Sequence, residues 1–208
     1  DEEAGTHRRF FDIGELAGLR VELPEVFEAT HALIFDLVER GLVQGLRVDH
    51  VDGLADPKGY LDRLQDRLRH ITRSDQPFYV LVEKILVGEE RLPADWPVAG
   101  TTGYEFANQV LGLLVDPSGI DPLERLRAEM TGEPEPFPAV VDRAKRFVLE
   151  NLFAGELNVL AQRAHRLLDL PQDVAKAAVT ELLVAFPVYR TYRRDEPLSP
   201  ADRAVLER

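Results

Sequence analysis

Two short segments of the sequence carry charged side chains inside stretches that otherwise suit a buried strand. Asp49 lies in the apolar run 42–51, and Glu83 lies in a second apolar run, 78–87. A charge inside a protein is costly unless a partner compensates it, so both carboxylates need an explanation. Arg47 precedes Asp49 by two residues and shares its side of a strand, so its guanidinium can orient that carboxylate and keep it ionised. Paired carboxylates in this setting suit nucleophilic and acid–base chemistry at a glycosidic bond.

The spacing of Asp49 and Glu83 predicts that the two carboxylates lie side by side. They are 34 residues apart, about one strand, helix and connection of a parallel β/α protein. Neighbouring strands lie about 4.8 Å apart, and β/α barrels carry their active sites at the carboxyl ends of the strands. The carboxyl groups are therefore expected about 5 to 5.5 Å apart, as in retaining glycosidases. A plainer alternative stays open, because Arg-x-Asp pairs are often salt bridges and a glutamate after an apolar run often begins a loop.

A hard-cation site is another alternative for this region, because Asp49, His50 and Asp52 offer ligands close together. No Asp-x-Asp-x-Asp-Gly loop accompanies them, so no metal is expected. The sequence also lacks a glycine-rich phosphate loop, a Gly-x-Ser-x-Gly turn and a His-Glu-x-x-His motif. The absence of cysteine excludes disulfides, thiol catalysis and cysteine-bound metals. We expect neither a metal nor a nucleotide nor an organic cofactor.

The elements that must position these residues alternate in type. Apolar residues at helical spacing predict a helix from Pro24 to about Gly41, a glycine that suits the end of a helix. The pair Asp56 and Pro57 predicts the start of a second helix, which runs to about Ile71. Each helix precedes one of the two apolar runs, which are predicted to be buried strands. The order helix, strand, helix, strand is typical of a parallel β/α architecture.

The strand pattern weakens after residue 88. Residues 88–119 predict a long ordered loop with a short helix at 104–114. Residues 120–186 predict a helical insertion, in which one helix breaks near Gly155 and another begins at Pro171. The residues expected to pack these helices against each other are Leu126, Phe147, Leu152, Leu157, Leu160, Leu167, Leu182 and Leu183.

The flanking segments carry weaker signals. Leu19–Val21 is expected to be a weak strand or an extended loop, and 187–192 is expected to return to a strand. Ser199 and Pro200 predict the start of a final helix.

Together these elements predict an α/β chain that is helix-rich overall and has a mainly helical insertion. The strands suit the middle of a (β/α)8 TIM barrel, so we expect part of a barrel and an all-α subdomain. The expected domains are a barrel segment with the two carboxylates and an active-site loop at 1–119, the helical insertion at 120–186, and a return to the barrel at 187–208.

Composition limits the partners of the chain. Of its 208 residues, 45% are hydrophobic and 30% are charged, which suits a soluble globular protein. The formal net charge of −12 argues against binding to nucleic acid or to an acidic membrane surface. No run of about 18 apolar residues is present, and no signal peptide opens the chain, so a cytoplasmic location is expected.

Residues 47–54 resemble the nucleophile strand of the α-amylase superfamily, glycoside hydrolase family 13, and residues 82–86 resemble its acid/base strand. Within that superfamily, the sequence of these two segments is similar to that of trehalose-forming glucan mutases. The resemblance spans about residues 8–193, and the further stretches that carry it are 8–12, 16–22, 96–106, 155–158 and 186–192.

The resemblance implies a reaction on malto-oligosaccharides, in which the reducing-end α-1,4 linkage becomes an α,α-1,1 linkage with retention. It implies that Asp49 is the nucleophile and that Glu83 is the general acid and base. Other expected substrate contacts are the polar residues Arg47, His50, Asp52 and Lys84 and the sugar-stacking aromatics Trp96, Tyr104 and Tyr189. Core packing remains the alternative for each aromatic, and a structural role remains the alternative for His50.

The sequence departs from the superfamily in two respects. The superfamily uses a third carboxylate, an aspartate on a later strand, and an early Asp-x-x-x-Asn-His strand; neither is found here. We therefore expect the middle part of a larger enzyme, with little or no activity alone, that self-associates through open sheet edges. Other α-glucan hydrolases or 4-α-glucanotransferases, or a non-catalytic glucan-binding or interaction module, are the competing hypotheses.

Overall fold

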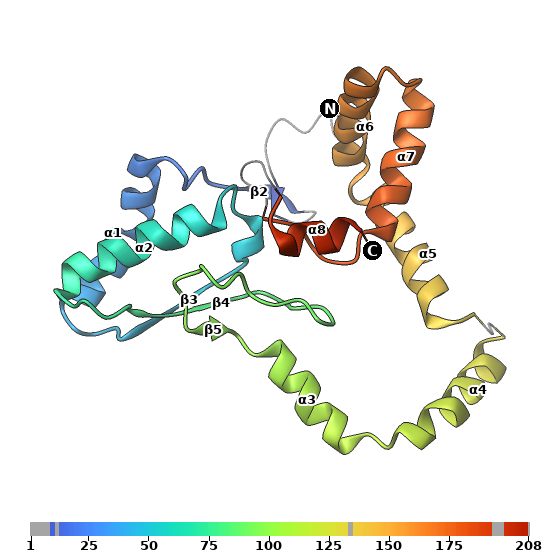
Figure 1. Ribbon diagram of the computed structural model, residues 1–208, viewed down its shortest axis with the longest axis horizontal. Helices are drawn as coiled ribbons and strands as arrows, with labels where there is room; N and C mark the ends of the chain where they lie inside the picture. The colour runs from blue at the N-terminus through green and yellow to red at the C-terminus, as the bar shows by residue number, and fades with distance from the viewer. Residues whose placement is uncertain (1–8, 11–12, 133–134, 193–197, 208) are drawn as a thin grey trace. The chain divides into compact units, whose positions relative to one another are not determined.

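The computed structural model describes residues 9–10, 13–132, 135–192 and 198–207 (Figure 1). The chain divides into two compact units. The first, here called the sheet unit, comprises 19–113 and 187–208, and the second, the helical unit, comprises 1–18 and 114–186. The elements of the sheet unit are α1 (Pro24–Glu39), β3 (Gly45–Val48), the 3-10 helix η1 (Val51–Gly53), α2 (Pro57–Thr72), β4 (Tyr79–Val82), β5 (Gly100–Thr101), α3 (Tyr104–Leu114, whose last residue belongs to the helical unit) and α8 (Pro200–Leu206).

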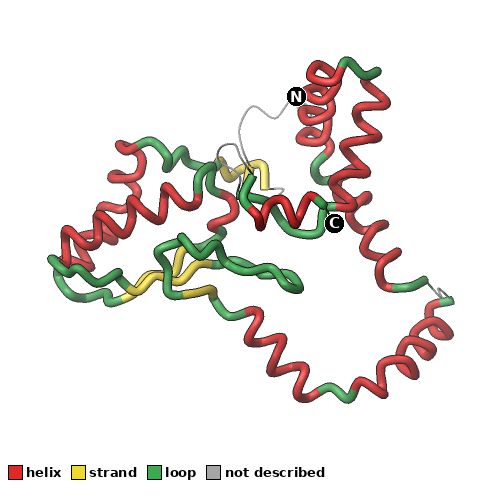
Figure 2. The backbone as a smooth tube through the Cα atoms, viewed as in Figure 1, coloured by secondary structure: helices red, strands yellow, loops and turns green. Residues whose placement is uncertain are grey.

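The strands of the sheet unit form a parallel sheet in the order β3-β4-β5, with β3 and β4 side by side in Figure 2. Val48 pairs with Val82, and Val82 pairs with Thr101. The expectation of two consecutive parallel strands is therefore confirmed. The ladder continues one residue further, because the Glu83 N–H donates to the Val48 carbonyl at 2.8 Å.

Helices α1 and α2 run alongside each other and supply most of the core of the sheet unit (Figure 1). Their apolar faces meet the buried side of β4, and burying each large apolar side chain contributes roughly 1.5–3 kcal/mol. Helix α2 begins as expected, because the Asp56 carboxylate accepts from the Gly59 N–H at 2.9 Å and Pro57 occupies the first turn. The buried core residues are Phe27, Phe35, Val38, Val51, Leu61, Leu64, Leu68, Val80, Val82 and Trp96.

A buried polar pair joins α1 to α2. The His31 Nδ1 lies 2.8 Å from the Phe27 carbonyl oxygen, so this nitrogen must carry the hydrogen. His31 Nε2 then accepts from the Tyr60 hydroxyl at 2.8 Å. Burial lowers the pKa of His31 below its ordinary value of 6.5, although the Phe27 carbonyl and the Glu28 carboxylate act in the opposite direction. The folded protein therefore favours a neutral imidazole.

This neutral histidine makes the stability of the sheet unit depend on pH. Below about pH 6.5 the unfolded chain protonates His31 more readily than the folded chain does, so the free energy of unfolding falls as the pH falls. We expect His31→Gln to lose less stability than the unsubstituted protein between about pH 7.5 and about pH 5.5. Urea unfolding followed by the fluorescence of Trp96, the single tryptophan, measures this difference. Equal losses in the two proteins would show that His31 does not titrate on unfolding.

The helical unit contains a short antiparallel strand pair and four longer helices. Helices α6 and α7 pack against each other through Leu157, Ala161 and Ala175 among their buried residues. Lys145 donates to the carbonyl oxygens of Val184 and Phe186 at 2.7 and 3.0 Å, at the end of α7. The elements of this unit are β1 (Arg9–Phe10), β2 (Ile13–Ala17), the 3-10 helix η2 (Pro117–Gly119), α4 (Ile120–Thr131), α5 (Phe137–Asn151), α6 (Ala154–Leu168) and α7 (Gln172–Ala185).

Two expectations about packing and strands are wrong. Of the apolar residues expected between the inserted helices, Leu157 is buried, but most of the others are exposed, with Leu167 at 83%. The helices are amphipathic as predicted, but apart from the buried contact between α6 and α7 their large apolar side chains are mostly exposed within the described residues. Residues 187–192 form no strand, because this segment is held by side-chain bonds rather than by a backbone ladder. Leu19–Val21 is a loop and turn, which agrees with the loop alternative rather than the strand.

Within the described part of the chain, no helix is both long and apolar enough to cross a membrane.

Candidate active site

Asp49 and Glu83 stand at the same edge of the parallel sheet. Each is the first residue after its strand, and the register aligns the ends of β3 and β4. Both carboxylates reach the same nitrogen: Arg47 Nη2 lies 2.9 Å from Asp49 Oδ1 and 3.6 Å from Glu83 Oε1. The distance between Asp49 Oδ1 and Glu83 Oε1 therefore cannot exceed the sum of these two distances. This arrangement suits two carboxylates that act on one glycosidic bond.

The accessibility of these three side chains differs. Asp49 and Arg47 are 61% and 51% exposed, whereas Glu83 is 25% exposed. The cation and the more open carboxylate thus face solvent, and the second carboxylate is more enclosed. Asp49 is therefore the more accessible of the two carboxylates at the strand edge.

The backbone at His50 fixes the orientation of Glu83. His50 adopts a left-handed conformation (φ 44°, ψ 50°), and its N–H donates to Glu83 Oε2 at 2.8 Å. The other oxygen of this carboxylate, Oε1, faces Arg47 Nη2. Gly53 makes the turn possible, because a Cβ there would lie 2.5 Å from His50 Cδ2. The His50 imidazole thus lies against the backbone of the same turn.

Asp52 and Lys84 lie in the interior, beneath this edge. The Lys84 side chain is fully buried, and its Nζ lies 3.2 Å from Asp52 Oδ2 and 2.8 Å from Glu90 Oε1. These are ion pairs without well-aligned hydrogen bonds, so the charge of the two carboxylates holds the ammonium. Neither side chain faces solvent, which favours a structural role for Asp52 and Lys84 over the expected bonds to sugar hydroxyls.

The segment 189–192 closes over the same turn. Arg190 Nη1 donates to the carbonyl oxygens of Asp52 and Leu54 at 3.0 and 2.8 Å. The Tyr192 hydroxyl donates to Asp52 Oδ1. Burial, followed by the Asp52 carboxylate, raises the pKa of Tyr192 well above its ordinary range, so this hydroxyl keeps its proton.

The three aromatic residues expected to stack on sugars differ in position. Trp96 is 6% exposed and meets the Tyr192 ring edge-on at 4.9 Å, so it is a core residue rather than an open platform. Tyr189 is 59% exposed and lies edge-on to the His50 ring at 6.0 Å, beside the strand edge. Tyr104 is 44% exposed at the start of α3. The structure thus brings Tyr189 to the site and removes Trp96 from solvent.

Sequence reasoning did not single out Arg190, Tyr192 or Glu90. The segment 187–192 was expected to return to a strand, and that expectation did not include side-chain bonds to residues 52–54. The sequence offered one signal for them: Asp52 and Lys84 are charged residues beside apolar runs, and charges that become buried require partners.

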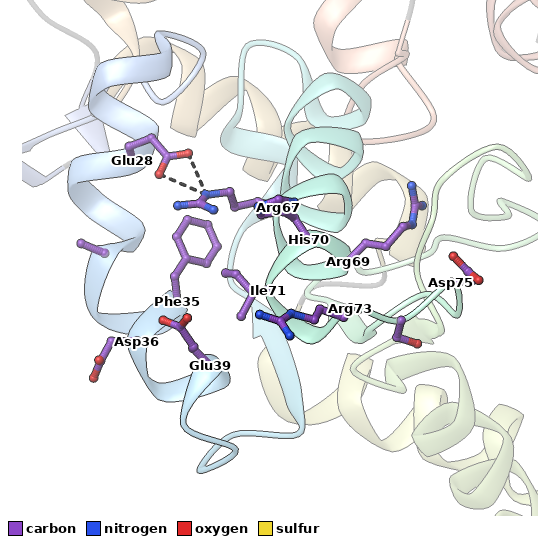
Figure 3. Close-up of a pocket in the computed structure, with 12 residues that line it drawn as sticks. Glu28, Phe35, Asp36, Glu39, Arg67, Arg69, His70, Ile71, Arg73 and Asp75 are labelled. Atoms are coloured by element: carbon purple, nitrogen blue, oxygen red, sulfur yellow. Dashed lines mark hydrogen bonds and ion pairs between the residues drawn. The ribbon is translucent and has the colours of Figure 1, made fainter.

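A separate groove of about 800 Å³ lies between α1 and α2 (Figure 3). Arg67 reaches across it to the Glu28 carboxylate at 3.2 Å. Its lining includes residues 73–75, which precede β4, so the groove lies toward the opposite edge of the sheet from Glu83. None of the predicted site residues lines it. In the part of the chain that the structure describes, no group of three or more histidine, aspartate and glutamate side chains is arranged to hold a metal ion.

Comparison with known proteins gives consistent relatives. A Mycobacterium tuberculosis protein, named provisionally as a maltooligosyl trehalose synthase in two strains, is 38% identical over 184 residues, which are 88% of this chain and 23% of that protein. The solved maltooligosyltrehalose synthase of Arthrobacter ramosus is 41% identical with a TM-score of 0.76 over 89% of this chain and 23% of that one. A solved glycosyltrehalose synthase is 35% identical with a TM-score of 0.78 over 97% of this chain and 25% of that one.

No protein-family model matches the chain. The chain spans about a quarter of the length of the relatives that it matches. These relatives agree in name, and the identity extends over most of the present sequence. The chain is therefore a homologue of one segment, about a quarter in length, of the maltooligosyl trehalose synthases.

Proposed function

We propose that this chain provides the nucleophile and the general acid of a trehalose-forming glucan mutase. The observation that carries the proposal is the placement of Asp49 and Glu83 at adjacent strand ends, with Arg47 Nη2 between their carboxylates. The relatives are named as synthases of maltooligosyl trehalose, and the reaction we propose for this chain is the conversion of the reducing-end α-1,4 linkage of a malto-oligosaccharide to α,α-1,1.

The proposed reaction has two displacements at one anomeric carbon. Asp49 attacks that carbon while Glu83 protonates the glycosidic oxygen, so the C–O bond breaks and a glucose is released within the site. Glu83 then removes the proton from the anomeric hydroxyl of this glucose, whose oxygen attacks the same carbon and breaks its bond to Asp49. Two inversions give net retention. Oε1 of Glu83 is suited to the proton transfer, since Oε2 is bonded to the His50 N–H.

We further propose that the sheet unit is part of a (β/α)8 barrel and that the remaining strands and the third carboxylate come from sequence outside this segment. The parallel order β3-β4-β5, with residues 49 and 83 following their strands at one edge, supports this architecture. The exposed apolar faces of the helices and the sheet edges at β3 and β5 favour association with further polypeptide, including other copies of the chain.

A chimera tests the proposed function. The matching segment of the Arthrobacter ramosus enzyme is replaced by this chain, and the product is here called the chimera. With maltopentaose, we expect the chimera to consume reducing ends and to form a non-reducing trehalosyl product, measured by a reducing-sugar assay and by NMR. We expect the 208-residue chain alone to show little or no turnover.

The products separate the competing functions. Release of maltose or of shortened reducing glucans would indicate a hydrolase or a 4-α-glucanotransferase and would contradict the proposal. A folded chimera that binds maltopentaose without converting it would favour a glucan-binding module. Circular dichroism establishes that the chimera is folded before either conclusion is drawn.

A further inference from the structure

We propose that Lys84, Asp52 and Tyr192 form a positioning network that sets the separation of Asp49 and Glu83. The inference rests on the proposed function and assigns these three residues a role without any contact to the sugar. Their side chains meet at one buried point: Lys84 Nζ and the Tyr192 hydroxyl bind the two oxygens of the Asp52 carboxylate.

The network is joined to both proposed catalytic residues through the backbone. Lys84 directly follows Glu83, and successive residues of an extended chain point to opposite sides. Glu83 therefore faces the strand edge while Lys84 enters the core. Asp52 lies three residues after Asp49, in the turn that also presents the His50 N–H to Glu83. The ion pair between Lys84 and Asp52 thus links the end of β4 to the end of β3.

Tyr192 adds a third attachment from a distant part of the sequence. Asp52 and Tyr192 are 140 residues apart, and the helical insertion lies between them. The Tyr192 backbone N–H donates to Asp202 Oδ1 at 3.3 Å, and Asp202 belongs to α8. Arg190 strengthens the same attachment through its bonds to the carbonyl oxygens of Asp52 and Leu54.

Burying the charged side chains of Lys84 and Asp52 costs free energy, so their presence at this point needs an explanation other than stability. A well-packed apolar cluster of similar volume is commonly as stable as a buried ion pair or more so. A shift of about 1 Å between reacting groups can cost about 10²-fold in rate. Stability alone therefore does not explain the buried pair of Lys84 and Asp52. Holding Asp49 and Glu83 at a fixed separation does.

Tyr192→Phe tests the inference by removing a single hydroxyl. In the chimera we expect kcat to fall about tenfold with KM changed less than about twofold, because the reacting groups shift while the sugar contacts remain. Tyr60→Phe is the matched control, since it also removes a buried hydroxyl bond, to His31 on the helices. We expect its kcat to match that of the unsubstituted chimera at a temperature where all three are folded.

A second readout uses the 208-residue chain itself. The His50 N–H donates to Glu83 Oε2, so its amide proton resonance reports the position of that carboxylate. We expect Tyr192→Phe to shift this resonance and Tyr60→Phe to leave it in place. An unmoved His50 resonance, or an unchanged kcat in a folded Tyr192→Phe chimera, would overturn the inference. A folded but inactive unsubstituted chimera would instead overturn the proposed function. The His50 amide resonance would then still test the positioning network, because it does not depend on activity.

Discussion

Glu83→Gln is expected to lower the kcat of the chimera by about 10²- to 10⁴-fold, because the amide cannot donate a proton to the leaving oxygen. Asp49→Asn is expected to lose at least as much, since no carboxylate remains to form the glycosyl intermediate. Both replacements preserve the size of the side chain at the strand edge, where Asp49 is exposed and Glu83 is partly enclosed. Steady-state rates with maltopentaose measure the effect.

A substrate with a better leaving group separates the two roles. Fluoride departs from an α-maltosyl fluoride without protonation, so the first displacement no longer needs the acid. We expect Glu83→Gln to recover much of its rate of fluoride release in the first turnover, before the second displacement needs the base, and Asp49→Asn to recover none. Recovery in both variants would contradict the assignment of Asp49 as the nucleophile.

The control for these variants is Glu89→Gln, an exposed glutamate in the loop that follows β4. It removes the same charge from the same region without reaching the strand edge. We expect its kcat to remain within about twofold of the unsubstituted chimera. A loss like that of Glu83→Gln would show that the net charge of the loop, rather than one carboxylate, governs the rate.

Local signals in the sequence were sufficient for the elements that present Asp49 and Glu83. Apolar periodicity predicted α1 and α2, the Asp56 and Pro57 pair predicted where α2 begins, and the apolar runs predicted β3 and β4. The chain separation of 34 residues predicted the register, which pairs Gly45 with Tyr79. The helices, the start of α2 and the strands depend on residues close in sequence, and the pairing of β3 with β4 follows from the usual length of one β/α unit.

Long-range contacts were not predictable in the same way. The two-residue strand β5 has no periodic pattern, and its pairing with β4 depends on the fold. The partner of Asp52 lies at Tyr192, and no local rule joins residues that far apart. Residues 187–192 were predicted to form a strand, but the side chains of Arg190 and Tyr192 bond to the turn at 52–54. Apolar helix faces predicted a core among α4–α7, whereas the structure leaves most of those residues exposed.

Lys84→Met is expected to destabilise the sheet unit by about 3–5 kcal/mol, the cost of removing one partner from a buried ion pair. The ammonium is fully buried between Asp52 and Glu90, which are themselves 9% and 12% exposed. Methionine fills a similar volume, so the loss arises from two carboxylates without a cation rather than from a cavity. Urea unfolding of the 208-residue chain, followed by Trp96 fluorescence, reports this unit because Trp96 lies in its core.

The matched control is Lys58→Met. Lys58 is 27% exposed and pairs with Asp62 at 2.7 Å within α2, so its loss should cost less than about 1 kcal/mol. Adding Asp52→Asn to Lys84→Met removes one stranded charge, and we expect part of the lost stability to return. Equal effects of Lys58→Met and Lys84→Met would mean that the buried ammonium contributes no more than a surface charge, and the interior at Asp52 would then have to be open to water.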